Sequence, residues 1–223
     1  ATAAQGSGLS NYTIAYNSGT LTVGAAGLTV TANDTNKVYG TVHGFTGTEF
    51  TLAGTLFNGD TLTNVSLSSA GEPASATVGI YPILATAAQG SGLSNYTIAY
   101  NSGTLTVGAA DLTVTANDTN TVYGTTHSFT GTEFTLLGTL FNGDTLTNFS
   151  LSSAGEPASA TLGTYPILAT AAQGSGLSNY TIAYNSGTLT IGAAGLTVTA
   201  NDTNKVYGTT HSFTGTEFTL LGT

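Results

Sequence analysis

The sequence contains no cysteine, methionine, tryptophan or arginine, and its only cations are Lys37 and Lys205. A chain without cysteine forms neither disulfides nor thiolate metal sites, so packing and hydrogen bonding must stabilise the fold. The formal net charge is −9. Nucleic-acid binding needs clustered cations that neutralise phosphates, and two lysines cannot supply them. We therefore expect no nucleic-acid partner.

Long apolar runs and charged residues are also scarce. No run approaches the roughly 18 apolar residues of a membrane span, so we expect no membrane insertion in this segment. Charged residues make up 6% of the chain and hydrophobic residues 40%. Disordered chains combine low hydrophobicity with high net charge, so this composition indicates a folded protein solvated by hydroxyl and amide groups. The rarity of lysine and the absence of oxidisable sulfur favour an extracellular location.

What the sequence does contain is a repeat. The segment LTVTANDTNKVYG begins at Leu28 and returns, with one substitution, from Leu112 and then unchanged from Leu196, a period of 84 residues. Residues 28–111 and 112–195 differ at only nine positions. Such regularity marks an array of equivalent units, and we expect the chain to be a window of a longer array. We predict four segments, namely the C-terminal part of a repeat (1–27), two complete repeats (28–111 and 112–195) and the N-terminal part of another (196–223).

Hydrophobic alternation predicts strands throughout the repeat. Leu28, Val30 and Ala32 alternate with threonines, which is the period of a strand with one buried face. The polar run 33–36 predicts a turn, followed by a short strand at 38–39. Roughly seven or eight such segments, without a helical period, predict an all-β fold. We expect tandem small β-sandwich repeats with an 84-residue period, arranged as an elongated rod or fibre.

Several local features give finer expectations. Asn58 and Gly59 stand between apolar residues and predict a β-hairpin, because both residues tolerate a positive φ. Pro82 predicts a sheet edge or the end of a strand. The small residues of segment 85–94 predict a flexible stretch. The alternating residues from Tyr96 to Val107 predict a second hairpin.

Three pieces of the repeat resemble a known family. They are the opening LTVTANDTNKVYG, the middle LFNGDTLTN followed by GIYPIL, and the closing SNYTIAYNSGTLTV. In this order they resemble the MBG-type repeats (YGX-like) of large bacterial adhesins and haemagglutinin-like proteins. The resemblance implies a mostly β, extracellular repeat of a stalk or fibre and brings no catalytic residues. It places the protein at the bacterial cell surface or in a secreted fibre.

Catalytic residues are not evident from the sequence. Each repeat carries one histidine, at His43, His127 or His211, and no second histidine lies nearby in the sequence. Neither a H-E-x-x-H motif nor a Ser-His-Asp set can be assembled from these residues. We interpret the histidines as loop residues and expect the protein not to be an enzyme.

Metal and covalent chemistry also have few candidates. We expect no metal site or cofactor; if Ca²⁺ binds, its ligands would come from Asp34, Asp60, Asp118 and Asp144. These aspartates stand in Asn-rich sequences that are equally typical of turns. Isopeptide bonds through Lys37 are not a general feature, because Thr121 replaces it in the next repeat. An ester through Gln89 or Gln173 and glycosylation of the N-x-S/T sequons remain open, the sequons beginning at Asn11, Asn33, Asn64, Asn95, Asn117, Asn148, Asn179 and Asn201.

Strand edges indicate the partners. Lysine and proline, which commonly guard exposed edges, are rare here. We therefore expect self-association or contacts between neighbouring repeats, including polymerisation through β-strand pairing. The two partial repeats do not add up to a whole one, so they cannot simply complement each other. The predicted function is a structural extracellular repeat of a bacterial surface fibre or adhesin stalk, and the alternative is a module that binds a glycan or host protein through the loops 33–36 and 71–75.

Overall fold

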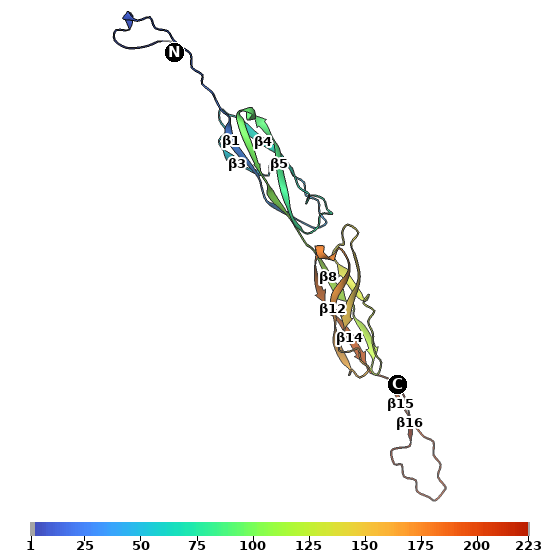
Figure 1. The fold of residues 1–223 in the computed structure, drawn as a ribbon. Coiled ribbons are helices and arrows are strands. Elements are labelled where there is room, and N and C mark those ends of the chain that lie inside the picture. The colour runs from blue at the N-terminus through green and yellow to red at the C-terminus, as the bar shows by residue number, and fades with distance from the viewer. Residues whose placement is uncertain (1–2, 223) are drawn as a thin grey trace. The chain divides into compact units, whose positions relative to one another are not determined.

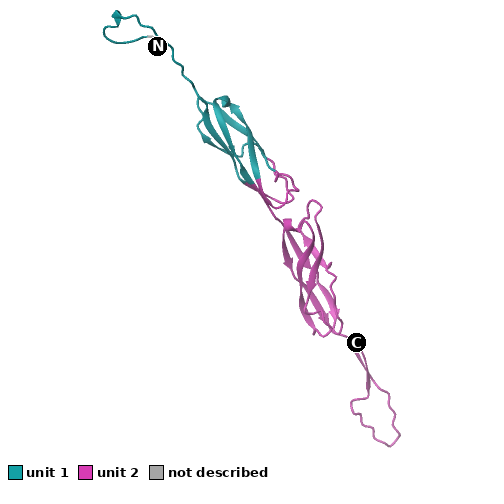
Figure 2. Cartoon of the chain, in the orientation of Figure 1, with its two compact units in different colours: residues 1–34, 45–69, 82–104 teal, residues 35–44, 70–81, 105–223 magenta. Residues whose placement is uncertain are grey.

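The computed structural model describes residues 3–222, and its regular elements are strands apart from three short 3₁₀ turns (Figure 1). The turns are η1 (Leu9–Asn11), η2 (Leu93–Asn95) and η3 (Leu177–Asn179). The predicted all-β fold is confirmed. The chain forms two compact units, one of residues 1–34, 45–69 and 82–104 and one of residues 35–44, 70–81 and 105–223 (Figure 2). The second unit therefore holds the second repeat, three segments of the first (35–44, 70–81 and 105–111) and the partial repeat that follows.

The second repeat, all of which the structure describes, has seven strands. They are β8 (Ala110–Ala116), β9 (Thr119–Val122), β10 (Phe134–Leu137), β11 (Thr145–Ser152), β12 (Gly163–Ser175), β13 (Tyr180–Asn185) and β14 (Gly187–Gly192). Three strands form one sheet in the order β10–β8–β13, and four form another in the order β11–β12–β14–β9. The pairs β8–β13 and β9–β14 are parallel, while the remaining pairs are antiparallel.

These two sheets pack face to face. Ala116 of the three-stranded sheet shares a buried cluster with Ile167 and Leu189 of the four-stranded sheet. Ile167 and Leu189 have no exposed surface. Burying an aliphatic side chain of this size contributes about 1.5–3 kcal/mol. The alternation of buried apolar residues with threonines thus produces the predicted β-sandwich.

The first repeat has the equivalent strands. They are β1 (Ala26–Ala32), β2 (Thr35–Val38), β3 (Phe50–Gly54), β4 (Thr61–Ser68), β5 (Gly79–Ser91), β6 (Tyr96–Asn101) and β7 (Gly103–Gly108). One sheet again has three strands, in the order β3–β1–β6. The parallel pair β2–β7 and the antiparallel pair β4–β5 reproduce β9–β14 and β11–β12. Because β2 begins at Thr35, the turn predicted for 33–36 is shorter than expected.

The partial repeat at residues 196–222 shows what the sandwich contributes. Its strands β15 (Leu196–Ala200) and β16 (Phe218–Gly222) pair with each other. Leu196 is 65% exposed, whereas its equivalent Leu112 is 1% exposed. The same strand sequence therefore forms the same antiparallel pair in both places, and burial of its apolar face needs the remaining strands of the sandwich.

Both predicted hairpins are wrong. Asn58 and Gly59 do adopt positive φ values, 54° and 78°. However, the preceding strand β3 pairs with β1, and the following strand β4 pairs with β5. Likewise β6 pairs with β1, whereas β7 pairs with β2. Local alternation identifies a strand but not its partner, and at both turns the chain moves to another sheet.

The expectation of a flexible stretch at 85–94 is also wrong, because β5 continues to Ser91. The register with β4 shifts where Ala87 and Ala88 lie opposite Val65, and Ala87 has a φ of 49°. The strand thus contains a bulge. The hydroxyl of Tyr100 accepts the Ala88 N–H at 2.9 Å, so the freed backbone group keeps a partner.

Proline lies inside a long strand instead of ending it. In the second repeat Pro166 pairs with Thr188 of β14, two residues before β12 begins to pair with β11 at Leu168. At the level of Pro166, β12 pairs with β14 and not yet with β11, so a missing N–H is tolerated. The prediction of a strand end is wrong, while the prediction of a local edge fits this position.

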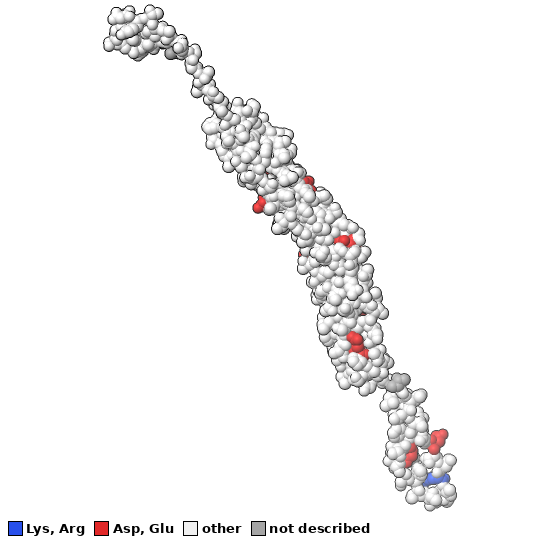
Figure 3. Space-filling view, viewed as in Figure 1, with Lys and Arg blue, Asp and Glu red and all other residues white. Residues whose placement is uncertain are grey.

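The surface carries little charge. Figure 3 shows scattered carboxylates among uncharged atoms on the face in view. Within residues 3–222, no helix has the length and apolarity to cross a membrane.

Candidate functional site at the repeat joint

Within the second compact unit, the segments 35–44 and 70–81 of the first repeat contact the second repeat. We call this contact the joint. Tyr39 lies at its centre and is 3% exposed. Its hydroxyl donates a hydrogen bond to Asp144 Oδ2 at 2.8 Å. Its ring meets the rings of Phe141 and Tyr180 edge-on, with centroid distances of 6.2 and 5.5 Å.

One carboxylate oxygen serves two tyrosines at the joint. Tyr180 also donates its hydroxyl hydrogen to Asp144 Oδ2, at 2.9 Å, and accepts the Phe141 N–H at 2.7 Å. Hydrogen bonds to a charged acceptor are stronger than neutral ones, so Asp144 holds both rings firmly. The Asn142 side chain lowers the pKa of Tyr39, but burial and Asp144 outweigh it and raise that pKa. Burial, reinforced by Asp144, raises the pKa of Tyr180.

Hydrogen bonds to backbone atoms hold the loop of the first repeat. Asn142 donates its side-chain N–H to the Ala74 carbonyl at 3.0 Å, and Asn179 Oδ1 accepts the Val78 N–H at 3.1 Å. Asn179 is only 6% exposed. Gly40 has a φ of 84°, and a Cβ there would overlap the ring of Phe141. The glycine therefore allows the close approach.

An apolar core lies beneath these polar contacts. Tyr39 and Tyr180 share a buried cluster with Val107, Ala110 and Leu112, which come from the end of β7 and from β8. Val107 and Leu112 are each 1% exposed. The connection between repeats is therefore part of a packed core, and not only a covalent linker.

Lys37 has a structural role that the sequence did not reveal. Its ammonium donates to the carbonyls of Thr41 (2.8 Å), Glu72 (3.1 Å) and Pro73. Burial lowers the pKa of Lys37, while the nearby Glu72 charge acts in the opposite direction. The lysine thus fastens the loop near Pro73 to the Tyr39 segment. In the next repeat Thr121 replaces it and hydrogen-bonds to the Thr125 hydroxyl at 2.6 Å.

The calcium candidates have separate hydrogen-bonding roles. Asp34 Oδ1 accepts the Thr104 N–H at 2.7 Å, and Asp118 does the same for Thr188. Asp60 accepts the Tyr96 hydroxyl at 3.0 Å, as Asp144 does for Tyr180. In residues 3–222, no three Asp, Glu or His side chains gather in a metal-binding arrangement. Calcium binding stays a prediction for which the structure brings no ligand set together.

The histidines lie in loops. The backbone N–H of His43 donates to Glu72 O at 3.0 Å, and that of His127 donates to Glu156 O at 2.9 Å. The rings of His127 and Phe129 meet edge-on at 4.7 Å, and the pair His211 and Phe213 is similar. These contacts describe loop packing, and the expectation that the protein is not an enzyme stays a prediction.

The structure also shows a recurring T-G-T-E turn that the sequence pattern did not predict. Glu49 accepts hydrogen bonds from the Thr46 hydroxyl at 2.6 Å and from the Gly47 and Thr48 N–H groups at 2.9 and 3.0 Å. These bonds, the Thr46 hydroxyl first, lower the pKa of Glu49 to about 2. Glu133 and Glu217 make equivalent bonds. The sequence does contain a signal for this turn, because the glutamate stands two residues after the glycine in each T-G-T-E segment.

The fold and the joint define a class, namely tandem β-sandwich repeats in which segments of one repeat contact the next. Residues 28–106 and 112–190 each match the family described as the MBG domain (YGX type). Since these matches cover more than half of the sequence, the chain belongs to the MBG family, and the resemblance noted above is confirmed. The first match contains the Tyr39–Gly40 pair of the joint. No curated protein matches the chain.

Proposed function

We propose that this chain is a structural part of a bacterial extracellular fibre or adhesin stalk, in which each repeat is held against the next. The observation that carries the proposal is the joint, where Tyr39 is buried and bonded to Asp144. A flexible linker needs no buried contacts, whereas packed contacts restrict the angles between neighbouring domains. An array with such joints would act as a spacer of fixed reach.

The composition supports an exposed role for this spacer. The chain has no cysteine or methionine to oxidise, and only two lysines at which trypsin-like proteases could cut. Its hydrogen bonds fasten turns that would otherwise be open to proteolysis, as the Glu49 turn illustrates. These properties suit a long-lived extracellular segment.

Scattering from arrays of increasing length tests the spacer role. Chains of two, three and four complete repeats, measured by small-angle X-ray scattering, should gain a constant increment of maximum dimension per repeat. A flexible string would instead grow with about the square root of repeat number. That square-root dependence would remove the structural basis of the proposal.

The cellular location needs a separate test. Antibodies raised against one repeat should label intact cells or shed fibres of the source organism. Labelling confined to lysed cells would contradict an extracellular role. Polymerisation through strand pairing also stays a prediction, and sedimentation of the purified chain at rising concentration checks it.

A further inference from the structure

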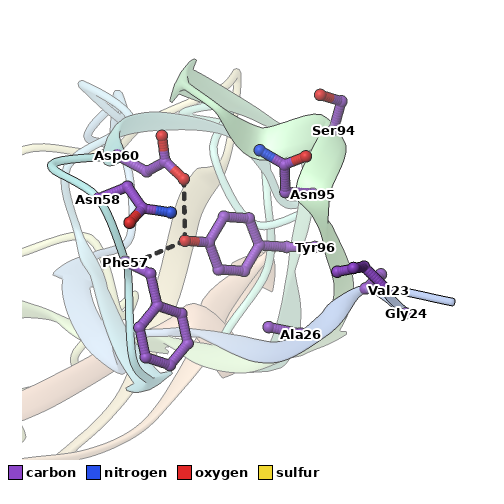
Figure 4. Close-up of a pocket in the computed structure, with 10 residues that line it drawn as sticks. Val23, Gly24, Ala26, Phe57, Asn58, Asp60, Ser94, Asn95 and Tyr96 are labelled. Carbon is purple, nitrogen blue, oxygen red and sulfur yellow. Dashed lines mark hydrogen bonds between the residues drawn. The ribbon is translucent and has the colours of Figure 1, made fainter. Parts of the chain in front are cut away.

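A surface pocket lies at the start of the first repeat, in the first compact unit (Figure 4). Its volume is about 420 Å³. The hydroxyl of Tyr96 lies on its wall, donating to Asp60 Oδ2 at 3.0 Å and accepting the Phe57 N–H at 2.7 Å. The lining residues are Val23, Gly24, Ala25, Ala26, Phe57, Asn58, Asp60, Ser94, Asn95 and Tyr96.

Every lining residue has an identical residue 84 positions later. Phe57, Asp60 and Tyr96 correspond to Phe141, Asp144 and Tyr180. The hydrogen bonds within the two surfaces are also the same, because Tyr180 makes both of the hydrogen bonds that Tyr96 makes. The pocket is therefore a second copy of the receiving side of the joint.

The two copies differ in what covers them. At the joint, Asp144 Oδ2 accepts a second hydroxyl, from Tyr39, whereas the only hydroxyl bonded to Asp60 among the described residues is that of Tyr96. Asn179 is 6% exposed and accepts a backbone N–H, while the equivalent Asn95 is exposed. Phe57 is 53% exposed. The open pocket therefore carries the same residues and internal hydrogen bonds as the surface that receives Tyr39 at the joint.

We propose that this pocket is the receptor for the tyrosine-bearing end of another MBG repeat, placed directly upstream in the same chain. The occupant's tyrosine enters beside Phe57 and donates its hydroxyl hydrogen to Asp60. Its loop places a carbonyl at Asn58 and an N–H at Asn95, as Ala74 and Val78 do at Asn142 and Asn179.

A tethered repeat fits better than a separate molecule. Val23 to Ala26 line the pocket, and their equivalents Val107 to Ala110 are the connection between two repeats. A repeat docking from another chain would have to place its own strand end where these residues lie. Tethering also supplies a high effective concentration. The complementary end exists on the second repeat, where Tyr123 is 44% exposed.

Footprinting of an extended chain tests the proposal. A copy of residues 112–195 is inserted between Gly27 and Leu28, so that the copy's Tyr123 stands one repeat ahead of the pocket. Hydroxyl-radical labelling then reports the exposure of Phe57, whose peptide contains Ala53 where the other complete repeats have Leu137. We expect insertion to reduce Phe57 labelling severalfold, to the level at Phe141 in the 223-residue chain. Phe213, 70% exposed, is the internal control and should not change.

A matched variant isolates the tyrosine. Tyr123→Ala in the inserted copy alone should restore Phe57 labelling, although the chain length is unchanged. Unchanged Phe57 labelling after insertion would overturn the proposal. So would protection of Phe57 in the 223-residue chain at rising concentration that Tyr123→Ala abolishes, since the occupant would then be a second molecule. The inference deepens the proposed function but concerns only the pocket, so surface labelling of cells can fail or succeed independently.

Discussion

Two copies of the same tyrosine-bearing end, one in each complete repeat, differ in the burial of their tyrosine. Ahead of the second repeat, Tyr39 is 3% exposed and fills the joint; the equivalent Tyr123 of the second repeat is 44% exposed. A Cβ on Gly40 would overlap Phe141, whereas a Cβ on Gly124 would meet nothing within 4 Å. Identical local sequence therefore gives different burial, because a neighbouring repeat supplies the other half of the site. The Tyr-Gly pair therefore stabilises the protein only where a following repeat receives the tyrosine.

Truncating the two tyrosines gives the largest expected contrast. Tyr39→Ala removes a buried ring and leaves Asp144 with one hydroxyl partner, so we expect a loss of about 3 kcal/mol in the free energy of unfolding. Tyr123→Ala removes a half-exposed ring and should cost less than about 1 kcal/mol. Urea denaturation of both variants measures the difference. Equal losses of unfolding free energy in the two variants would show that contact with the following repeat does not distinguish Tyr39 from Tyr123.

The two lysines give a smaller contrast. Lys37 is 9% exposed and its ammonium donates to three carbonyls, while Lys205 is exposed. Lys37→Met would leave those carbonyls without their donor, at a cost of about 1–3 kcal/mol. Lys205→Met should change stability by less than about 0.5 kcal/mol. A shift in thermal midpoint for Lys37→Met no larger than for Lys205→Met would mean that water replaces the ammonium.

The sequence predicts what depends on local pattern. The period of 84 residues, the number of strands and the sandwich follow from alternation and repetition, as Leu112 and Val114 illustrate with exposures of 1% and 0%. Strand partners do not follow, since β6 and β7 are adjacent in the chain but lie in different sheets. The bulge at Ala87 is also hidden, because alanine gives no sign of a positive φ.

The joint illustrates the same limit at the candidate site. Asp60 and Asp144 stand in an Asn-Gly-Asp sequence, which by itself indicates a turn or an oxygen ligand. Their tyrosine partners lie 36 residues away in the same repeat and, for Asp144, 105 residues away in the preceding one. No local pattern contains that pairing. Exact repetition makes Tyr39 equivalent to Tyr123 and Asp144 equivalent to Asp60, but only the structure brings Tyr39 and Asp144 together.

The glutamate turns should show the smallest effect and no contrast between repeats. Glu49 and Glu133 make the same bonds within their own turns, and each has a pKa lowered from 4.5 to about 2. A carboxyl group whose pKa is lower in the folded state stabilises that state at pH values above its pKa in the unfolded chain. This stabilisation is lost as the pH falls through the pKa of the folded state. Stability should therefore decline between about pH 5 and pH 2.

Substituting either glutamate should flatten this acid dependence. We expect Glu49→Gln and Glu133→Gln each to cost less than about 1 kcal/mol at neutral pH, because solvent screens charges at these surface turns. The thermal midpoint measured from neutral to acid pH should fall less steeply in each variant, and by the same amount in both. Neither turn contributes to the joint, so unequal effects would mean that contact between repeats extends to the turns. The different burial of Tyr39 and Tyr123 would then have to be explained by a larger interface than the joint.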